Sequence, residues 1–391
     1  MRFRRRNTAI LAGVLLVGVA MVLGCTTLRF NPARSRAQAR VPEEVLQRYA
    51  YPHAKFERID SEQLAGAGSS GAQWETPFKF TIRAVSETGA YVLHEVEIFT
   101  GRDSVRFDYY MVKGSRPRPV VLVFPIFGGK YVFAKMFSHY FANGGLHCAL
   151  IYRKDGLTDA KTLTEFEPAL ARIVVDSKIA IDWLSGRNEL DAERIGTFGI
   201  SMGGIKSAVV KCLEPRVGPA VVALAGGTLA EILASSREPE IVERREEIMK
   251  TEGIDPAEFR ERTDAAVVTD PLKLATYADP SEVKMFVTLF DRTVPTRCQL
   301  RLWRGLGRPE LSVLPFGHYT AVLSIPYARW QSLRFFERRF GIKSVRRPPL
   351  PAQFGRACDM SVGFHIRPGR RGGSRTLPRE AARASPTTRD W

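Results

Sequence analysis

The chain has 391 residues and a formal net charge of +17, a balance that would favour a nucleic-acid-binding protein if the charge were spread evenly. The charge lies instead at the two ends: residues 1–40 hold eight arginines and no acidic residue, and residues 343–391 hold eleven basic and three acidic residues. Residues 41–342 carry 39 basic and 38 acidic side chains, which leaves no surplus of cations for a basic face, so the sequence excludes nucleic acid as a partner of this core.

The N-terminus has the organisation of an export signal. A basic start is followed by an uncharged apolar run, residues 10–23, that is short for a membrane span. The run ends at Gly24-Cys25, which resembles the lipobox of bacterial lipoproteins. We therefore expect residues 1–24 to be a lipoprotein signal peptide and Cys25 to carry the lipid. The exported protein would then be anchored on the periplasmic or extracellular face of a membrane. A signal anchor that happens to end in Cys is the alternative.

The segment after the lipobox leads into a folded domain. Residues 25–41 are polar and basic without hydrophobic periodicity, which is typical of a tether. We expect the domain to span residues 42–342. Short alternating runs within residues 78–112 predict antiparallel strands at a sheet edge.

The pattern changes at Val120. Residues 120–124 are continuously apolar, as in a strand buried on both faces. The elements predicted after it are a helix (132–143), a strand (147–152), a helix (163–185), a strand (194–198), a helix (202–213) and a strand (220–225). Strands that alternate with helices predict an α/β fold with a mostly parallel, doubly wound sheet and helices on both faces.

The turn between residues 198 and 202 is the most informative stretch. In Gly199-Ile200-Ser201-Met202-Gly203, a serine stands between two glycines at two-residue spacing, after a strand and before a helix. This is the pattern of a nucleophile elbow, in which a strained turn lifts the serine hydroxyl clear of the sheet and bulk at the flanking positions is not tolerated. The Met202 N–H, at the helix start, would supply half of an oxyanion hole.

Two further segments complete the predicted organisation. Residues 228–283 separate two strands and carry helix start signals such as Asp255-Pro256 and Asp270-Pro271, so we interpret them as a helical lid insertion. Residues 343–391 are rich in Pro, Arg and Gly with few apolar residues, which predicts a disordered basic tail.

From about residue 105 to residue 341 the chain resembles the α/β-hydrolase superfamily of serine hydrolases. The resemblance implies a catalytic triad in the order Ser, acid, His. His318 then becomes the candidate base, because the only other histidine beyond the predicted acid, His365, lies in the tail. Asp291, directly after a strand, is the candidate acid, with Asp270 in the insertion as its competitor.

The second oxyanion donor departs from the pattern of many relatives. Pro125-Ile126 stand where these carry His-Gly, and alignment of the following Gly-Gly pair makes the Phe127 N–H the candidate. The long helix before the elbow is similar to that of the dienelactone-hydrolase-like or prolyl-oligopeptidase-like branch, although the nucleophile is Ser rather than the Cys of true dienelactone hydrolases.

These features predict a serine hydrolase that cleaves a carboxylic ester or a related acyl compound through an acyl-enzyme. Cys148, Cys212, Cys298 and Cys358 show no metal-ligand spacing, and we expect neither a metal nor an organic cofactor. The expected partners are a small-molecule acyl substrate and, through the lipid, a membrane; the oligomeric state is left open. The competing hypotheses are a peptidase or thioesterase on the same triad, or a non-catalytic lipoprotein scaffold.

Overall fold

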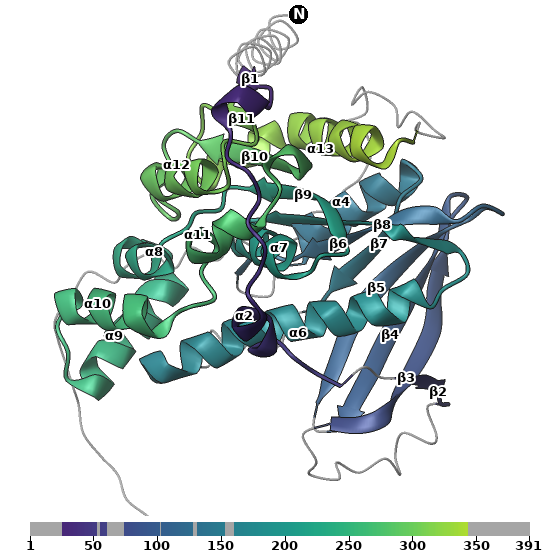
Figure 1. Cartoon of the computed structure of the whole chain (residues 1–391), viewed down its shortest axis with the longest axis horizontal. Coiled ribbons are helices and arrows are strands. Elements are labelled where there is room, and N and C mark those ends of the chain that lie inside the picture. Colours follow the sequence, from purple (N-terminus) through teal and green to yellow (C-terminus); the bar gives the residue numbers. More distant parts are fainter. Residues whose placement is uncertain are drawn as a thin grey trace, which may run out of the picture. The chain divides into compact units, whose positions relative to one another are not determined.

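The computed structural model describes residues 26–52, 55–60, 74–101, 103–127, 131–152 and 160–342 (Figure 1). They belong to one compact unit. The predicted signal peptide, Cys25 and the tail from residue 343 lie outside the described residues, and the expectations for them stay predictions.

A single sheet forms the centre of the unit. In the described residues its strands are β1 (Thr26–Leu28), β2 (Phe56–Arg58), β3 (Trp74–Glu87), β4 (Tyr91–Gly101), β5 (Ser104–Val112), β6 (Arg118–Phe124), β7 (His147–Ile151), β8 (Leu190–Ile200), β9 (Val217–Ala223), β10 (Val283–Thr288) and β11 (Glu310–Leu314). Their order is β1-β11-β10-β9-β8-β6-β7-β5-β4-β3-β2. Strands β7, β6, β8, β9, β10 and β11 pair in parallel, whereas β3, β4 and β5 form the expected antiparallel strands on one side.

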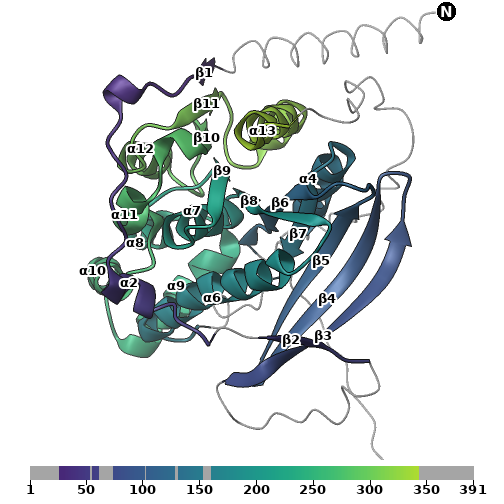
Figure 2. The same cartoon turned by 45° about the vertical axis from the view of Figure 1, so that its right-hand side comes forward.

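Helices cover both faces of the parallel strands. They are α2 (Glu43–Gln47), α4 (Val132–Asn143), α6 (Phe166–Ser185), α7 (Met202–Leu213), α8 (Leu229–Ser235), α9 (Pro239–Glu252), α10 (Pro256–Ala266), α11 (Pro271–Leu274), α12 (Thr296–Gly305) and α13 (Ile325–Phe340). Helices α6, α7 and α12 pack on one face, and α4 and α13 pack on the other (Figure 2). The predicted α/β class with a mostly parallel sheet is confirmed.

Alternation along the buried strands explains why they are apolar throughout. In β6, Val120, Leu122 and Phe124 pack into the core with α6 and α7. Val121 and Val123 point the other way, into the core with α4 and α13. Because side chains alternate between the two faces of a strand, a strand covered on both sides needs apolar residues at every position.

Residues 228–283 form a helical segment between β9 and β10, as their start signals predict. Asp255 and Glu258 form a capping box at the start of α10, with Pro256 at the first helical position. Asp270 caps α11, which packs against α7 and α12. Its role as a lid stays a prediction.

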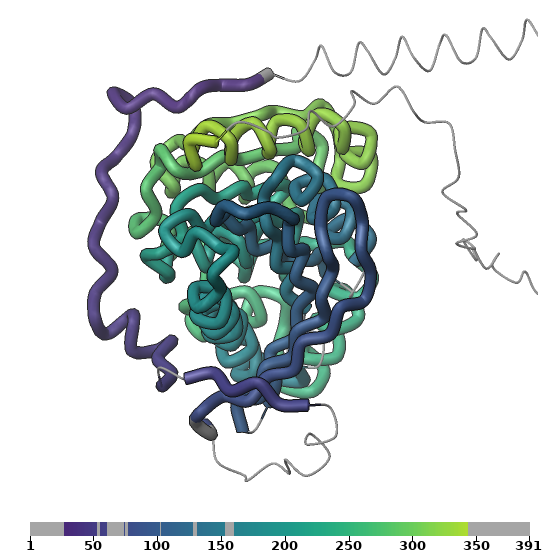
Figure 3. The backbone as a smooth tube through the Cα atoms, turned by 90° about the vertical axis from the view of Figure 1, so that its right-hand side faces the viewer, coloured from purple at the N-terminus to yellow at the C-terminus, as the bar shows by residue number. Residues whose placement is uncertain are grey.

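Residues 26–41, for which we expected a tether, lie along the domain in this structure. Strand β1 pairs antiparallel with β11 at the edge of the sheet. Farther along, the Arg36 guanidinium donates to the carbonyls of Gly305 and Thr276 at 2.9 Å each. Figure 3 shows the segment as a purple tube that follows the outside of the domain down to α2. The segment contacts the domain through backbone groups and single side chains. Such contacts produce no hydrophobic periodicity, so the sequence does not predict them.

Among the described residues, no helix combines the length and the apolar composition that a membrane crossing requires.

An ion pair joins β10 to β11 inside the core. The Lys284 ammonium is fully buried and lies 2.5 Å from the Glu310 carboxylate, which Arg338 also contacts. Burial lowers the pKa of Lys284. Burial alone would raise the pKa of Glu310, but Lys284 and Arg338 outweigh it and hold that pKa below its ordinary value. The two side chains thus form an ion pair in a low-dielectric environment, where each partner depends on the other.

Replacing Glu310 with Ala should lower the free energy of unfolding by about 3–5 kcal/mol, because the Lys284 ammonium would stay buried without its partner. The double replacement Lys284→Met with Glu310→Leu should recover most of this loss. Urea denaturation followed by tryptophan fluorescence measures both effects. Arg338→Ala is the control: its side chain is about half exposed, so its loss should cost less than about 1 kcal/mol. Equal stability of the Glu310→Ala variant and the parent would contradict this account.

Candidate active site

Ser201 occupies a strained turn between β8 and α7. Its backbone has φ 56° and ψ −121°, a conformation that L-residues other than glycine rarely adopt. The turn is held in place by the Ser201 N–H, which donates to the Ala223 carbonyl at the end of β9 at 2.8 Å. Strain of this kind costs of the order of 1–3 kcal/mol and persists only where the surroundings impose it.

The flanking glycines have the steric cause that the sequence predicts. A Cβ atom on Gly199 would lie 2.0 Å from the Gly203 carbonyl oxygen. A Cβ atom on Gly203 would lie 2.3 Å from the Phe124 carbonyl oxygen at the end of β6. Both obstacles are backbone atoms, which cannot move aside as a flexible side chain can. The following Gly204 is restricted in the same way by Ala223, a constraint that the elbow pattern does not include.

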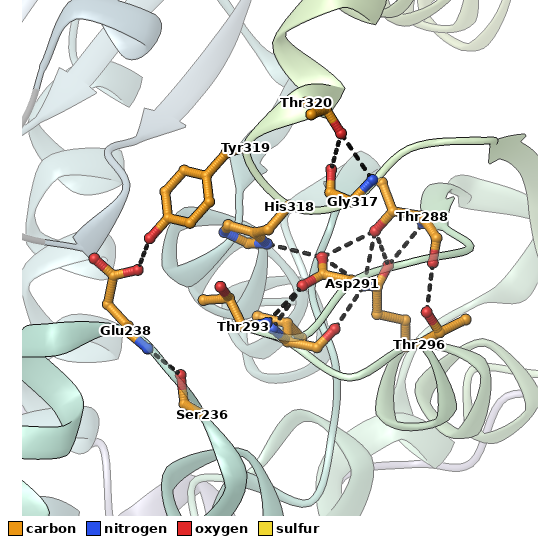
Figure 4. Close-up of polar contacts among 12 residues, drawn as sticks. Ser236, Glu238, Thr288, Asp291, Thr293, Thr296, Gly317, His318, Tyr319 and Thr320 are labelled. Carbon is orange, nitrogen blue, oxygen red and sulfur yellow. Dashed lines mark hydrogen bonds and ion pairs between the residues drawn. The ribbon is translucent and has the colours of Figure 1, made fainter.

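The Asp291 carboxylate follows β10 and is held by hydrogen bonds on both oxygens (Figure 4). Its Oδ1 accepts from the N–H groups of Thr293 and Val294, at 2.9 Å each. Its Oδ2 accepts from the Thr288 hydroxyl at 2.9 Å and from the Gln299 side-chain amide at 3.0 Å. The side chain has no exposed surface, so these donors fix its orientation.

His318 lies against the same carboxylate. Its Nδ1 is 2.8 Å from Asp291 Oδ2, and because a carboxylate can only accept, the histidine donates from Nδ1. The Nε2 atom then keeps its lone pair for a proton from elsewhere. The His318 side chain is 13% exposed, so the ring is sheltered yet within reach of solvent.

The parallel strands bring the three residues to one edge of the sheet. Ser201 follows β8, Asp291 follows β10 and His318 follows β11, and the carboxyl ends of parallel strands meet at the same edge. Backbone hydrogen bonds join neighbouring strands near this edge. The Leu224 N–H, just after β9, donates to Phe286 O in β10 at 2.8 Å, and the Leu289 N–H, just after β10, donates to Leu314 O at the end of β11 at 3.0 Å.

The aspartate and the histidine are thus in contact, and the serine lies at the same edge. Among the described residues, no hydrogen bond connects the Ser201 hydroxyl with His318. Bonds between a nucleophile and its base are often long without substrate and tighten in the complex.

The surroundings of Met202, the first oxyanion candidate, are described in the structure, whereas those of Phe127, the second, are described only in part. Met202 is the first residue of α7, where backbone N–H groups have no partner within the helix and the helix dipole favours negative charge. Phe127 follows β6, whose last carbonyl lies against Gly203 at the start of the same helix. Residues 128–130 lie outside the described part of the chain, and the role of the Phe127 N–H stays a prediction.

Asp270, the competing acid, makes a different set of contacts. Its carboxylate accepts from the Leu272 N–H at 2.7 Å, which caps α11. It also accepts from the N–H groups of Thr228 and Leu229 at the start of α8, at 3.2 and 2.5 Å. These donors are backbone amides at two helix starts, whereas Asp291 contacts a histidine.

Gln299 is, with Thr288, a residue of this site that sequence reasoning missed. It belongs to α12, and its amide nitrogen donates to Asp291, to the Thr288 hydroxyl and to the Val294 carbonyl at 2.8–3.0 Å. Its amide oxygen accepts from the Thr288 N–H at 3.1 Å. A glutamine on the inner face of an otherwise amphipathic helix is the only local sign of this role.

Comparison with known proteins shows the fold of the chain but assigns it to no family. No protein-family model and no curated protein matches this sequence. Among solved structures, an acetyl xylan esterase from Paenibacillus sp. R4 superposes with a TM-score of 0.55 and 18% identity, covering 76% of this chain and 100% of its own. Acetyl xylan esterase 1 from Thermoanaerobacterium sp. JW/SL YS485 gives 0.53 and 16%, covering 76% and 99%. The chain therefore shares the α/β fold of these two esterases.

Asp270→Ala and Asp291→Ala should separate stability from reactivity. Loss of the Asp270 carboxylate leaves backbone N–H groups at two helix starts without their acceptor, and should lower the free energy of unfolding by about 2–4 kcal/mol. Labelling of Ser201 by a fluorophosphonate should persist in the folded fraction of that variant and slow strongly in Asp291→Ala. Labelling that slows equally in both variants would show that Asp270 serves the same histidine.

Proposed function

We propose that this protein is a serine hydrolase that cleaves a carboxylic ester or a related acyl compound through an acyl-enzyme. The observation that carries the proposal is the strained Ser201 turn on the sheet edge that also holds the Asp291–His318 pair. The shared fold with two acetyl xylan esterases agrees with an ester as substrate, but at 16–18% identity it does not select the acyl group.

The first half of the reaction forms the acyl-enzyme. Ser201 Oγ bonds to the carbonyl carbon of the substrate as its proton passes to His318 Nε2. The N–H groups of Met202 and Phe127 would donate to the oxyanion that develops. When the intermediate collapses, the bond to the leaving alcohol breaks and the alcohol takes the proton from Nε2.

The second half releases the acyl group. Water attacks the ester on Ser201 while its proton passes to His318 Nε2, and Ser201 then regains a proton from the same atom. Asp291 remains ionised throughout, orients the ring through Nδ1 and stabilises the imidazolium. The four other hydrogen bonds to Asp291 keep its carboxylate directed at the ring.

If the three residues act as one unit, Ser201→Ala and His318→Ala should each lower kcat by about a millionfold, and Asp291→Ala by about ten-thousandfold. The double variant of Ser201 and His318 should be hardly worse than either single one, because both changes remove the same pathway. A series of nitrophenyl esters of graded acyl length measures these rates and the acyl preference.

Fluorophosphonate labelling gives a reading that needs no knowledge of the substrate. It should mark the parent and fail with Ser201→Ala. Absence of labelling in the parent would favour a non-catalytic scaffold. Cleavage of thioesters in preference to esters would favour a thioesterase on the same triad, and cleavage of peptides would favour a peptidase.

We also propose that the mature protein is a lipoprotein exported to the periplasmic or extracellular face of a membrane and anchored through Cys25. The lipobox-like end of the apolar run supports this location. In fractionated cells, Cys25→Ala should leave the protein unprocessed or release it from the membrane. A variant that stays membrane-bound at the normal processed size would show that another element anchors the chain.

A further inference from the structure

The loops that carry the acid and the base expose large apolar side chains. Phe290 is 68% exposed, Tyr319 65% and Leu323 60%, and Leu289 and Val322 are about half exposed. We refer to these five residues as the apolar rim. Leu289 and Phe290 precede Asp291 in the loop after β10, and the other three follow His318.

Backbone contacts make the two loops one surface. The Phe290 N–H donates to the Phe316 carbonyl at 3.0 Å, and a Cβ atom on Gly317 would lie 3.0 Å from the Phe290 carbonyl oxygen. The Val322 N–H donates to the Tyr319 carbonyl at 3.3 Å, within the same turn. Large apolar side chains gathered and exposed in this way mark an interaction surface, since they would otherwise be left in water.

The described chain begins near the carboxyl end of β11, at the edge of the sheet that carries the candidate triad. In the antiparallel pairing of β1 with β11, Thr26 stands opposite Val313, one residue before β11 ends. The Thr27 hydroxyl fixes this start by hydrogen bonds of 3.1 Å to Ser312 and 2.7 Å to Tyr327. In Figures 1 and 2, β1 lies beside β11, with α13 next to them. Cys25 precedes this point by a single residue, a reach of about 3.8 Å.

We propose that this edge of the sheet docks on the lipid surface to which Cys25 is anchored, and that the substrate is an acyl ester carried by that lipid phase. The inference rests on the proposed esterase activity and on lipidation of Cys25. With β1 fixed against β11, the attachment point is held at the edge that carries the apolar rim. Docking places the rim in the lipid interface and the candidate triad directly above it.

Polar groups around the rim suit a membrane interface. Arg292, directly after Asp291, is exposed and forms no ion pair with another described residue, so it is available to anionic headgroups. The Tyr319 hydroxyl donates to Glu238 at the start of α9, which brings the insertion to the border of the rim (Figure 4). Partial burial and this carboxylate raise the pKa of Tyr319 to about 12, so the ring stays neutral, as interfacial tyrosines are.

The first experiment measures docking directly. An environment-sensitive fluorophore is attached at Leu323→Cys or, as the matched control, at Val85→Cys. Val85 is also apolar and about half exposed, but it lies on β3, far along the sheet from β11. Cys358 is replaced by Ser. Cys148, Cys212 and Cys298 are buried, and burial raises their pKa, so these thiols do not compete for the label.

The labelled, mature lipoproteins are reconstituted into vesicles of phosphatidylethanolamine and phosphatidylglycerol with brominated acyl chains. We expect quenching at position 323 and emission unchanged from the lipid-free state at position 85. Equal quenching at both positions overturns the proposal, and so does a mature protein that carries no lipid on Cys25. Disulfide-linked dimers of the unlabelled Leu323→Cys protein under air oxidation, in place of quenching of the labelled one, would assign the rim to a second copy of the chain and overturn the proposal as well.

The second experiment tests the substrate. Val322→Ser with Leu323→Ser should lower hydrolysis of a long-chain nitrophenyl ester held in the vesicles by about tenfold, while hydrolysis of soluble nitrophenyl acetate stays unchanged. Val85→Ser should change neither rate. Equal loss on both esters would mean that the rim supports the catalytic site and would overturn the proposal. If the parent cleaves neither ester, the proposed activity fails, whereas the fluorescence readout still reports docking.

Discussion

The start of α7 lies so close to β8 and β6 that the backbone leaves no room for a side chain at Gly199 or Gly203. This contact fixes where the helix begins and holds Ser201 in its positive-φ turn. Strands β9, β10 and β11 continue outward from β8 in parallel, so the loops that carry Asp291 and His318 end at the same edge. The geometry of the whole candidate site therefore depends on a steric fit between glycines and main-chain atoms.

Much of this arrangement could be predicted from the sequence because it is encoded locally. The elbow, the acid after a strand and the histidine before the last helix are each predicted by a short stretch of sequence. Gln299 could not be found in this way, because its bonds to Asp291 and Thr288 arise only when α12 packs on β10. The docked path of residues 26–41 was likewise missed, since it is held by main-chain pairing and by Arg36 rather than by an apolar stripe. In the sheet, β6 lies next to β8 and β7 lies next to β5, which reverses their order in the chain. No local sequence pattern predicts this reversal.

Asp270 and Asp291 illustrate how one residue type serves different ends. Both are buried and both accept several hydrogen bonds. The donors to Asp270 are main-chain amides at two helix starts, where a negative charge stabilises the helix dipole. The donors to Asp291 include the Nδ1 of a histidine. What distinguishes the candidate catalytic carboxylate is therefore the identity of one donor rather than burial or strand position alone.

The pairing of β1 with β11 has a consequence for the order in which the chain folds. Thr27 and Ser312 are 285 residues apart, so the first strand of the domain to be synthesised finds its partner only when nearly the whole domain has been made. Contacts of such long sequence separation form late, because closing the loop costs entropy before the contact is gained. Until then the outer edge of β11 is an open strand edge, a template for pairing between chains. The pairing of β1 with β11 is thus a late step of folding, and it covers the outer edge of β11.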